Sequence, residues 1–196
     1  MRTSAGARTA STVIGEEFAD LLAAAQGGSE AAFSRLWRNG NPALLRYLRV
    51  IAPGAEEDIA AETWVCVVRG LSSFTGEEQA WRAWLFTTAR RRAIDLARHR
   101  SRRPEAALDE FTAAQLPSSE DSAEAAMENL STAAAIALVA ELPRLQAEVI
   151  LLRVVAGLDT ESVARMLCKS PGAVRVAAHR GLRRLAQLTA EAGVTL

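Results

Sequence analysis

The sequence is poor in the residues that most often build a metal site, a disulfide framework or a catalytic centre. Its 196 residues include two cysteines, Cys66 and Cys168, and two histidines, His99 and His179. Two distant cysteines form neither a metal site nor a close-spaced redox pair, so we expect reduced thiols. Neither histidine has a catalytic partner near it in sequence, and no glycine-rich phosphate loop is present. We therefore expect neither enzymatic activity nor a cofactor.

Strand-forming residues and long apolar runs are also scarce. Aromatic residues make up only 5% of the chain although 49% of its residues are apolar, and alanine is abundant, which favours helices. No apolar run is long enough to cross a bilayer, and residues 1–15 lack the apolar centre of a signal peptide. The sequence predicts an all-α protein in the cytoplasm, without insertion into a membrane.

The formal net charge of zero conceals three charged blocks. Residues 82–103 contain eight arginines and one acid, a net charge of +7. Residues 104–130 contain seven acids and no base, and residues 165–184 contain six bases and no acid. Two basic blocks flanking an acidic one are typical of a protein with two polyanion-binding parts joined by a spacer.

Apolar periodicity divides the chain into two small helical domains. We expect a flexible tail over 1–15, a first domain over 16–103, a flexible acidic linker over 104–131 and a second domain over 132–196. In the first domain, Asn39-Gly40-Asn41-Pro42 is expected to separate two helices, and another long helix is expected over about 80–100.

The second domain contains the pattern of a helix-turn-helix. Asp159 or Thr160 can cap a short helix, and Ser170-Pro171 marks the start of a long basic helix that ends near Ala190. Helical spacing gives this long helix one apolar face, which should pack on the domain, and one basic face, which should contact DNA. The alternative is that the basic face is only a solvated surface. The expected packing residues are Val174, Ala178 and Leu182, and the expected DNA-facing residues are Arg175, His179, Arg180 and Arg183.

The arginine-rich helix of the first domain follows a loop with aromatic neighbours. Phe74 precedes this helix, and Trp81 and Trp84 lie within it. Positive charge beside aromatic side chains suits unpaired bases and their backbone. Two tryptophans three residues apart in an apolar run are more often core residues, so we assign base contacts to the loop and the arginines.

Three stretches of the sequence resemble one protein family. They are DIAAETWVCVVRGLSSF (58–74), WRAWLFTTARRRAIDLARHR (81–100) and LPRLQAEVILLRVVAGLDTESVARMLCKSPGAVRVAAHRGLRRL (142–185). In this order they are similar to regions 2 and 4 of the extracytoplasmic-function (ECF, group IV) sigma factors of the sigma-70 family. The resemblance covers about 18–103 and 132–190. It implies a subunit that gives RNA polymerase promoter recognition and the ability to melt DNA.

The resemblance also implies partners and contact residues. The partners would be core RNA polymerase, through the clamp helices of its largest subunit and its flap, promoter DNA, and an anti-sigma factor. The implied polymerase contacts are Asp58, Ala61, Glu62 and Val65. The implied −10 contacts are Ser72, Ser73, Phe74, Arg82, Arg90, Arg91 and Arg98. The implied −35 contacts are Lys169, Ser170, Arg175, His179, Arg180 and Arg183.

The sequence departs from the family pattern at two places. Cys168 and Lys169 occupy a turn that usually contains glycine, so the turn must close without the left-handed freedom of glycine. Val176 and Ala177 replace polar residues common on the recognition helix, which leaves fewer side chains to read base edges.

Alternatives remain for several of these features. The acidic linker is either a solvated spacer or a segment attracted to the basic RNA exit channel of the polymerase. Cys66 could sense oxidants, although a lone helical cysteine is usually a small buried hydrophobe. The whole chain could instead be a stand-alone helix-turn-helix regulator whose residues 18–103 form a sensor or dimerisation unit. The basic block at 82–103 favours the sigma factor, because a sensor has no need of it.

Overall fold

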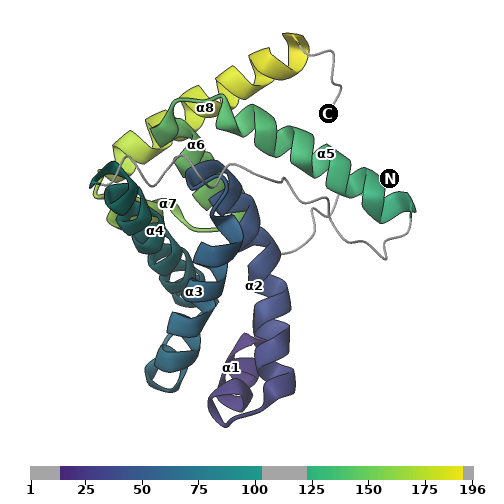
Figure 1. Ribbon diagram of the computed structural model, residues 1–196, viewed down its shortest axis with the longest axis vertical. Coiled ribbons are helices and arrows are strands. Elements are labelled where there is room, and N and C mark those ends of the chain that lie inside the picture. Colours follow the sequence, from purple (N-terminus) through teal and green to yellow (C-terminus); the bar gives the residue numbers. More distant parts are fainter. Residues whose placement is uncertain (1–13, 103–122, 192–196) are drawn as a thin grey trace, which may run out of the picture.

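The computed structural model describes residues 14–102 and 123–191, and these residues form helices joined by short turns, with no strand among them. The expected all-α fold is confirmed. Helices of the second half of the chain lie across one end of α2 and α4 (Figure 1). The helices are α1 (Phe18–Gln26), α2 (Glu30–Ile51), α3 (Glu56–Gly70), α4 (Glu78–Arg102), α5 (Ala123–Ala140), α6 (Arg144–Ile150), α7 (Thr160–Leu167) and α8 (Pro171–Glu191).

Helices α1–α4 form a first helical unit around a common apolar core. Helices α1, α3 and α4 all pack against α2. Its buried Tyr47 meets Phe86 of α4 edge to face, with ring centroids 5.4 Å apart. Aromatic pairs in this geometry add to the stabilisation that burial of their area provides. The core therefore fixes α4, with its arginines, relative to α2.

Helix α2 is continuous through Asn39–Pro42, so the predicted break into two helices is wrong. An added Cβ at Gly40 would lie 3.1 Å from Cδ2 of Leu85 and 3.3 Å from a ring carbon of Trp64, so glycine permits close packing there. Trp64 Nε1 donates a hydrogen bond to Oδ1 of Asn41 over 2.9 Å. Gly40 and Asn41 thus make tertiary contacts with α3 and α4. The stabilisation from these contacts outweighs the intrinsic cost of Pro42 inside a helix.

Helix α5 begins at Ala123, inside the segment predicted to be a flexible linker over 104–131. Alanine, glutamate, methionine and leucine dominate its first turns, and all four are good helix formers. The rest of that prediction, over 103–122, lies outside the described residues, as does most of the predicted flexible tail over 1–15.

Helices α5–α8 form a second helical unit with the expected helix-turn-helix. Helix α6 continues into a π-helical turn, η4 (Leu151–Val155), and ends before Gly157, whose φ is +65°. Asp159 caps α7, because its carboxylate accepts a 2.6 Å hydrogen bond from the backbone of Ser162. This bond lowers the pKa of Asp159. An added Cβ at Gly181 would lie 2.5 Å from Cδ1 of Ile150, so glycine lets α8 cross α6 closely.

The turn between α7 and α8 closes through a left-handed cysteine. Cys168 has φ 52° and ψ 47°, and it is the only non-glycine residue with positive φ among residues 14–102 and 123–191. As expected, the turn closes without glycine, and Cys168 adopts the left-handed conformation instead. This conformation strains the residue, because a Cβ in the left-handed region costs roughly 1–2 kcal/mol. Its side chain is exposed, so packing does not offset that cost.

We predict that Cys168→Gly stabilises the protein by about 1 kcal/mol, since relief of the strain exceeds the extra entropy that glycine gains on unfolding. Urea unfolding followed by circular dichroism measures the change. Cys168→Ala is the matched control, because it removes the thiol and keeps the Cβ. If alanine stabilises as much as glycine, the strain account is incorrect.

Candidate nucleic-acid interface

One face of α8 is cationic and exposed to solvent. Its opposite face is buried through Val174, Ala177, Gly181 and Leu188. Leu182 is 54% exposed, so the prediction that it packs into the core is wrong. The packing face is rotated relative to the predicted one, because α8 packs on α6 at Gly181, where an added Cβ would lie 2.5 Å from Cδ1 of Ile150. The exposed residues include all four predicted DNA-facing positions: Arg175, His179, Arg180 and Arg183.

The start of α8 presents further polar groups to the same side. Ser170 Oγ accepts a 3.2 Å hydrogen bond from the backbone of Ala173 and so caps the helix. Lys169 and Gly172 are exposed beside it. A helix N-terminus carries partial positive charge, which adds to the attraction of these side chains for phosphate. Val176, 50% exposed, is an apolar residue on this cationic face.

The segment between α3 and α4 is held in place by hydrogen bonds from side chains to its backbone carbonyls. It opens with a 3₁₀ turn, η2 (Leu71–Ser73), and the side-chain amide of Gln26 donates to the carbonyls of Leu71 (2.9 Å) and Phe74 (2.7 Å). Ser72 and Ser73 are exposed, and Ser73 Oγ donates to the carbonyl of Gly70 over 3.0 Å. The loop is therefore ordered and presents two hydroxyls.

Aromatic rings form a cluster behind this loop. Phe74 stacks on Trp84 with centroids 5.1 Å apart and an interplanar angle of 12°, and it meets Trp81 edge to face at 5.5 Å. Trp81 is 2% exposed, which confirms that it is a core residue. Phe74 is half-buried by the two tryptophans, so one side of its ring is already occupied.

The four α4 arginines predicted to lie along the −10 strand have different environments. Arg91 and Arg98 are exposed, and the 3.7 Å contact between Arg98 and Asp95 is a solvent-screened pair. Arg90 is half-buried and Arg82 is buried. The structure therefore leaves two of the four arginines open to a ligand and engages the other two inside the protein.

Arg82 contacts the second helical unit. Its guanidinium forms hydrogen bonds of 2.6 and 3.1 Å with Glu78 of the same helix and donates over 3.2 Å to the carbonyl of Ala156. Burial lowers the pKa of Arg82, and Glu78 opposes this effect. Next to it, the side chain of Gln79 donates over 3.0 Å to the carbonyl of Gly157. The start of α4 thus binds the carbonyl groups at the end of η4.

Arg90 and Tyr47 contact the second unit at Glu148 of α6. The Nε of Arg90 lies 2.8 Å from the Glu148 carboxylate, and the hydroxyl of Tyr47 donates to the same oxygen over 3.1 Å. The Glu148 side chain is only 7% exposed. Burial, and then the Glu148 charge, raise the pKa of Tyr47 well above its usual value, so Tyr47 remains the donor.

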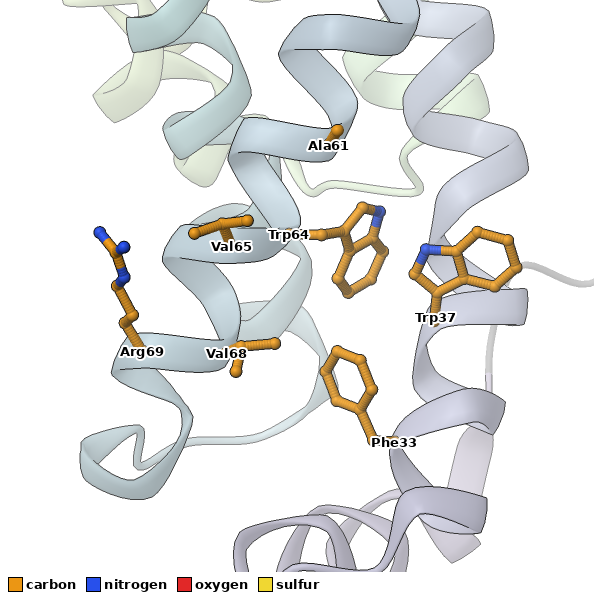
Figure 2. Close-up of a pocket in the computed structure, with 7 residues that line it drawn as sticks. All are labelled: Phe33, Trp37, Ala61, Trp64, Val65, Val68 and Arg69. Carbon is orange, nitrogen blue, oxygen red and sulfur yellow. The ribbon is translucent and has the colours of Figure 1, made fainter.

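A third surface is apolar and lies between α2 and α3. Phe33 and Trp37 of α2 face Trp64 of α3, with the α3 side chains of Val65 and Val68 beside them (Figure 2). Trp37, Val65 and Val68 are 42%, 49% and 54% exposed. We call this surface the α2–α3 groove; its lining is Phe33, Trp37, Ala61, Trp64, Val65, Val68 and Arg69.

The groove lining includes two of the four residues predicted to contact the polymerase. Ala61 and Val65 line it, whereas Asp58 and Glu62 are exposed elsewhere on α3. Glu62 lies 3.5 Å from Arg92 of α4, whose guanidinium also contacts the Cys66 sulfur at 2.9 Å. The sequence did not indicate that Phe33, Trp37 and Val68 line a groove, because periodicity within one helix does not show which apolar residues an adjacent helix leaves uncovered.

No described helix is long and apolar enough to cross a membrane. Within the described ranges, no group of three or more Cys, His, Asp or Glu side chains is placed to hold a metal ion.

Comparison with known proteins gives two family matches. Residues 36–103 match the family described as sigma-70 region 2, and residues 132–185 match the one described as sigma-70, region 4. The first match contains the loop, α4 and the groove lining apart from Phe33, and the second contains most of α8. Most of each of the three surfaces therefore falls within a matched segment.

Two curated relatives cover most of the chain. The ECF RNA polymerase sigma factor ShbA of Streptomyces griseus is 35% identical over 188 residues, which are 90% of this chain and 95% of ShbA. The ECF RNA polymerase sigma factor BldN of Streptomyces coelicolor is 33% identical over 173 residues, which are 86% of this chain. The chain spans 64% of the length of BldN, just under two thirds.

Two solved structures share the fold. CnrH, in complex with the cytosolic domain of CnrY, has a TM-score of 0.59 at 22% identity and covers 90% of this chain and 99% of its own. The sigma factor RpoE of Bartonella quintana, in complex with the anti-sigma factor NepR, has a TM-score of 0.60 at 23% identity. That match covers 80% of this chain and 95% of RpoE.

Proposed function

The chain belongs to the extracytoplasmic-function sigma factors of the sigma-70 family, and we propose on this basis that it binds core RNA polymerase and directs initiation at promoters with defined −35 and −10 elements. The observation that carries the proposal is the presence, on one chain, of a cationic recognition helix and an exposed apolar groove. A protein that only binds DNA needs the cationic helix, whereas a polymerase subunit that recognises promoters needs both the helix and a groove for docking.

The exposed face of α8 is proposed to enter the major groove of the −35 element. Arg175, His179 and Arg180 would meet base edges or phosphates, and Arg183, Lys169 and Ser170 would lie near the backbone. In the first unit, the loop hydroxyls of Ser72 and Ser73 and the arginines of α4 would follow the separated −10 strand. The exposed Arg91 and Arg98 are available for this in the described arrangement, and Arg82 and Arg90 would first have to leave the second unit.

The α2–α3 groove is proposed to dock on the clamp helices of the largest polymerase subunit. Its exposed tryptophan and valines form the apolar centre, and the exposed Asp58 and Glu62 of α3, outside the groove lining, are proposed as additional polar contacts. Apolar centres with polar rims are typical of protein interfaces. The second unit would contact the flap. In this role the chain catalyses no reaction itself, and it acts in the cytoplasm beside the chromosome.

An anti-sigma factor is a further proposed partner. CnrH and RpoE are described in complex with CnrY and NepR respectively. We propose that this chain also has such a regulator, and that the regulator covers the α2–α3 groove. An exposed apolar surface of this kind suits protein binding, so a regulator that covers it would block the docking of core polymerase.

A stand-alone helix-turn-helix regulator would explain α8 but not the first unit. The match of residues 36–103 to sigma-70 region 2, together with the groove in that segment, has no role in such a protein. We therefore favour the sigma factor.

Run-off transcription tests the function directly. Core polymerase with the purified chain, acting on a promoter library, should initiate at promoters that share one pair of −35 and −10 elements. Binding of the free chain to duplex DNA without any initiation would favour the regulator instead.

The groove generates a prediction about polymerase binding. Val65→Asp places a charge in the apolar centre and should weaken binding to core polymerase by about 2 kcal/mol, roughly 30-fold, as expected for a central interface residue. Fluorescence anisotropy of the labelled chain titrated with core enzyme measures this. Val65→Ile keeps the surface apolar and should bind as the unaltered chain does. Equal affinities for all three chains would rule out the groove as the docking site.

Val176 generates a prediction about −35 specificity. An exposed, rigid, branched side chain among cations can contact the 5-methyl group of thymine in the major groove. Replacing that thymine by deoxyuridine removes one methyl group and should weaken promoter binding by about 0.8 kcal/mol, roughly fourfold. Open-complex formation with single deoxyuridine substitutions across the −35 element locates the position.

Val176→Ala is the matched control. It should abolish the difference between thymine and deoxyuridine at that position while initiation at the same start site continues. If the unaltered chain tolerates deoxyuridine at every −35 position, Val176 does not read a methyl group.

A further inference from the structure

The last residue of α1, Gln26, connects the first helix to the loop between α3 and α4. Its side-chain amide donates over 2.9 Å to the carbonyl of Leu71 and over 2.7 Å to the carbonyl of Phe74. A primary amide has two N–H donors, and both are used here on carbonyls that bracket Ser72 and Ser73. Because both partners are acceptors, it is the nitrogen of the amide that faces them.

The backbone of Gln26 is fixed by the way in which α1 ends. Gly28 has φ 92°, and its N–H donates to the carbonyl of Ala25 over 3.1 Å. The N–H of Ser29 donates to the carbonyl of Ala24 over 3.0 Å. These two hydrogen bonds form a Schellman motif, a common end of a helix at a left-handed glycine. Ser29 then caps α2 with its side chain, so the amide of Gln26 extends from a closed corner between two helices.

The loop that Gln26 contacts is anchored at both ends and exposed between them. Leu71 is buried, and Phe74 belongs to the aromatic cluster behind the loop. The N–H of Phe74 closes the turn by donating to the carbonyl of Leu71 over 3.1 Å. Ser72 and Ser73 between them are exposed. Gln26 therefore supports the exposed part of the loop from behind and leaves its outer side free.

We propose that Gln26 is the positioning residue of this loop, and that it keeps the loop in the one shape that receives an unpaired base of the −10 element. The contact between loop and base rests on the proposed function; the fixing of the loop by Gln26 does not. A loop that is already held in its binding shape loses little entropy when a base binds. Gln26 precedes residues 36–103, the match to sigma-70 region 2, and it acts through the loop without touching DNA.

Amide hydrogen exchange in the free chain tests the contact by itself. Gln26→Glu keeps the size of the side chain and replaces both donors with a carboxylate, which repels the two carbonyl oxygens. The N–H of Phe74 should then exchange about tenfold faster than in the unaltered chain, because loss of two neutral hydrogen bonds lets the turn open more often. Gln26→Met adds no charge and should accelerate the exchange less; it serves if Gln26→Glu does not fold.

Open-complex formation by the holoenzyme tests the consequence for DNA. The probe is a promoter found by run-off transcription, in which each −10 nucleotide of the non-template strand is replaced in turn by an abasic one. The unaltered chain should lose affinity at the position whose base the loop receives. If Gln26→Glu leaves the loop in its binding shape about one time in ten, affinity for the intact promoter falls about tenfold. The abasic effect at that one position should shrink by the same factor, and the effects at other positions should stay as they were.

Gln187→Glu is the matched control, because it makes the same change at an exposed position near the end of α8 that the proposed function does not use. It should leave the exchange at Phe74 and the promoter affinity unaltered. All variants should bind core polymerase equally, since Gln26 does not line the α2–α3 groove. A general loss of structure would instead lower the affinity for every abasic promoter.

Two results would overturn the proposal. One is unchanged exchange at Phe74 in both Gln26→Glu and Gln26→Met. The other is a loss of affinity in these variants that is the same for every −10 position. If the unaltered chain starts no transcription at all, the proposed function fails, and the exchange rates still decide whether Gln26 fixes the loop.

Discussion

The two helical units of this sigma factor meet through buried apolar residues and through the buried carboxylate of Glu148. It accepts hydrogen bonds from α2 and α4 together, at the end of the first unit where the arginine-rich helix passes the second. Burial of a carboxylate is costly unless its charge is paired, so Tyr47 and Arg90 are required wherever Glu148 is covered. The apolar core places α4, and the Glu148 contact covers Arg90 on the proposed −10 surface.

The three proposed binding surfaces differ in whether they depend on the relative position of the two units. The exposed face of α8 is set by packing inside the second unit, mainly where Gly181 meets Ile150. The α2–α3 groove is set inside the first unit, where Gly40 and Asn41 hold Trp64. Both surfaces are therefore independent of the contact between the units. The arginines of α4 alone link DNA binding to the relative position of the two units.

Local patterns in the sequence predicted the helices, the helix-turn-helix and the basic faces, because these depend on spacing and capping within short segments. Asp159 and Ser170 act as the caps expected from their positions. Features that depend on tertiary contact were not predictable in this way. Pro42 lies inside a helix because Gly40 packs against Trp64 and Leu85, and Leu182 is exposed because α8 meets α6 through Gly181. The pairing of Glu148 with residues distant in sequence gave no local signal.

An electron cryomicroscopy map of the chain bound to core polymerase on a promoter tests the account most directly. The account predicts that the α2–α3 groove lies on the clamp helices, that α8 lies in the major groove of the −35 element, and that Arg90 has exchanged Glu148 for the −10 strand. A complex in which the groove faces solvent, or in which Arg90 still pairs with Glu148 while the −10 strand is bound, would contradict it.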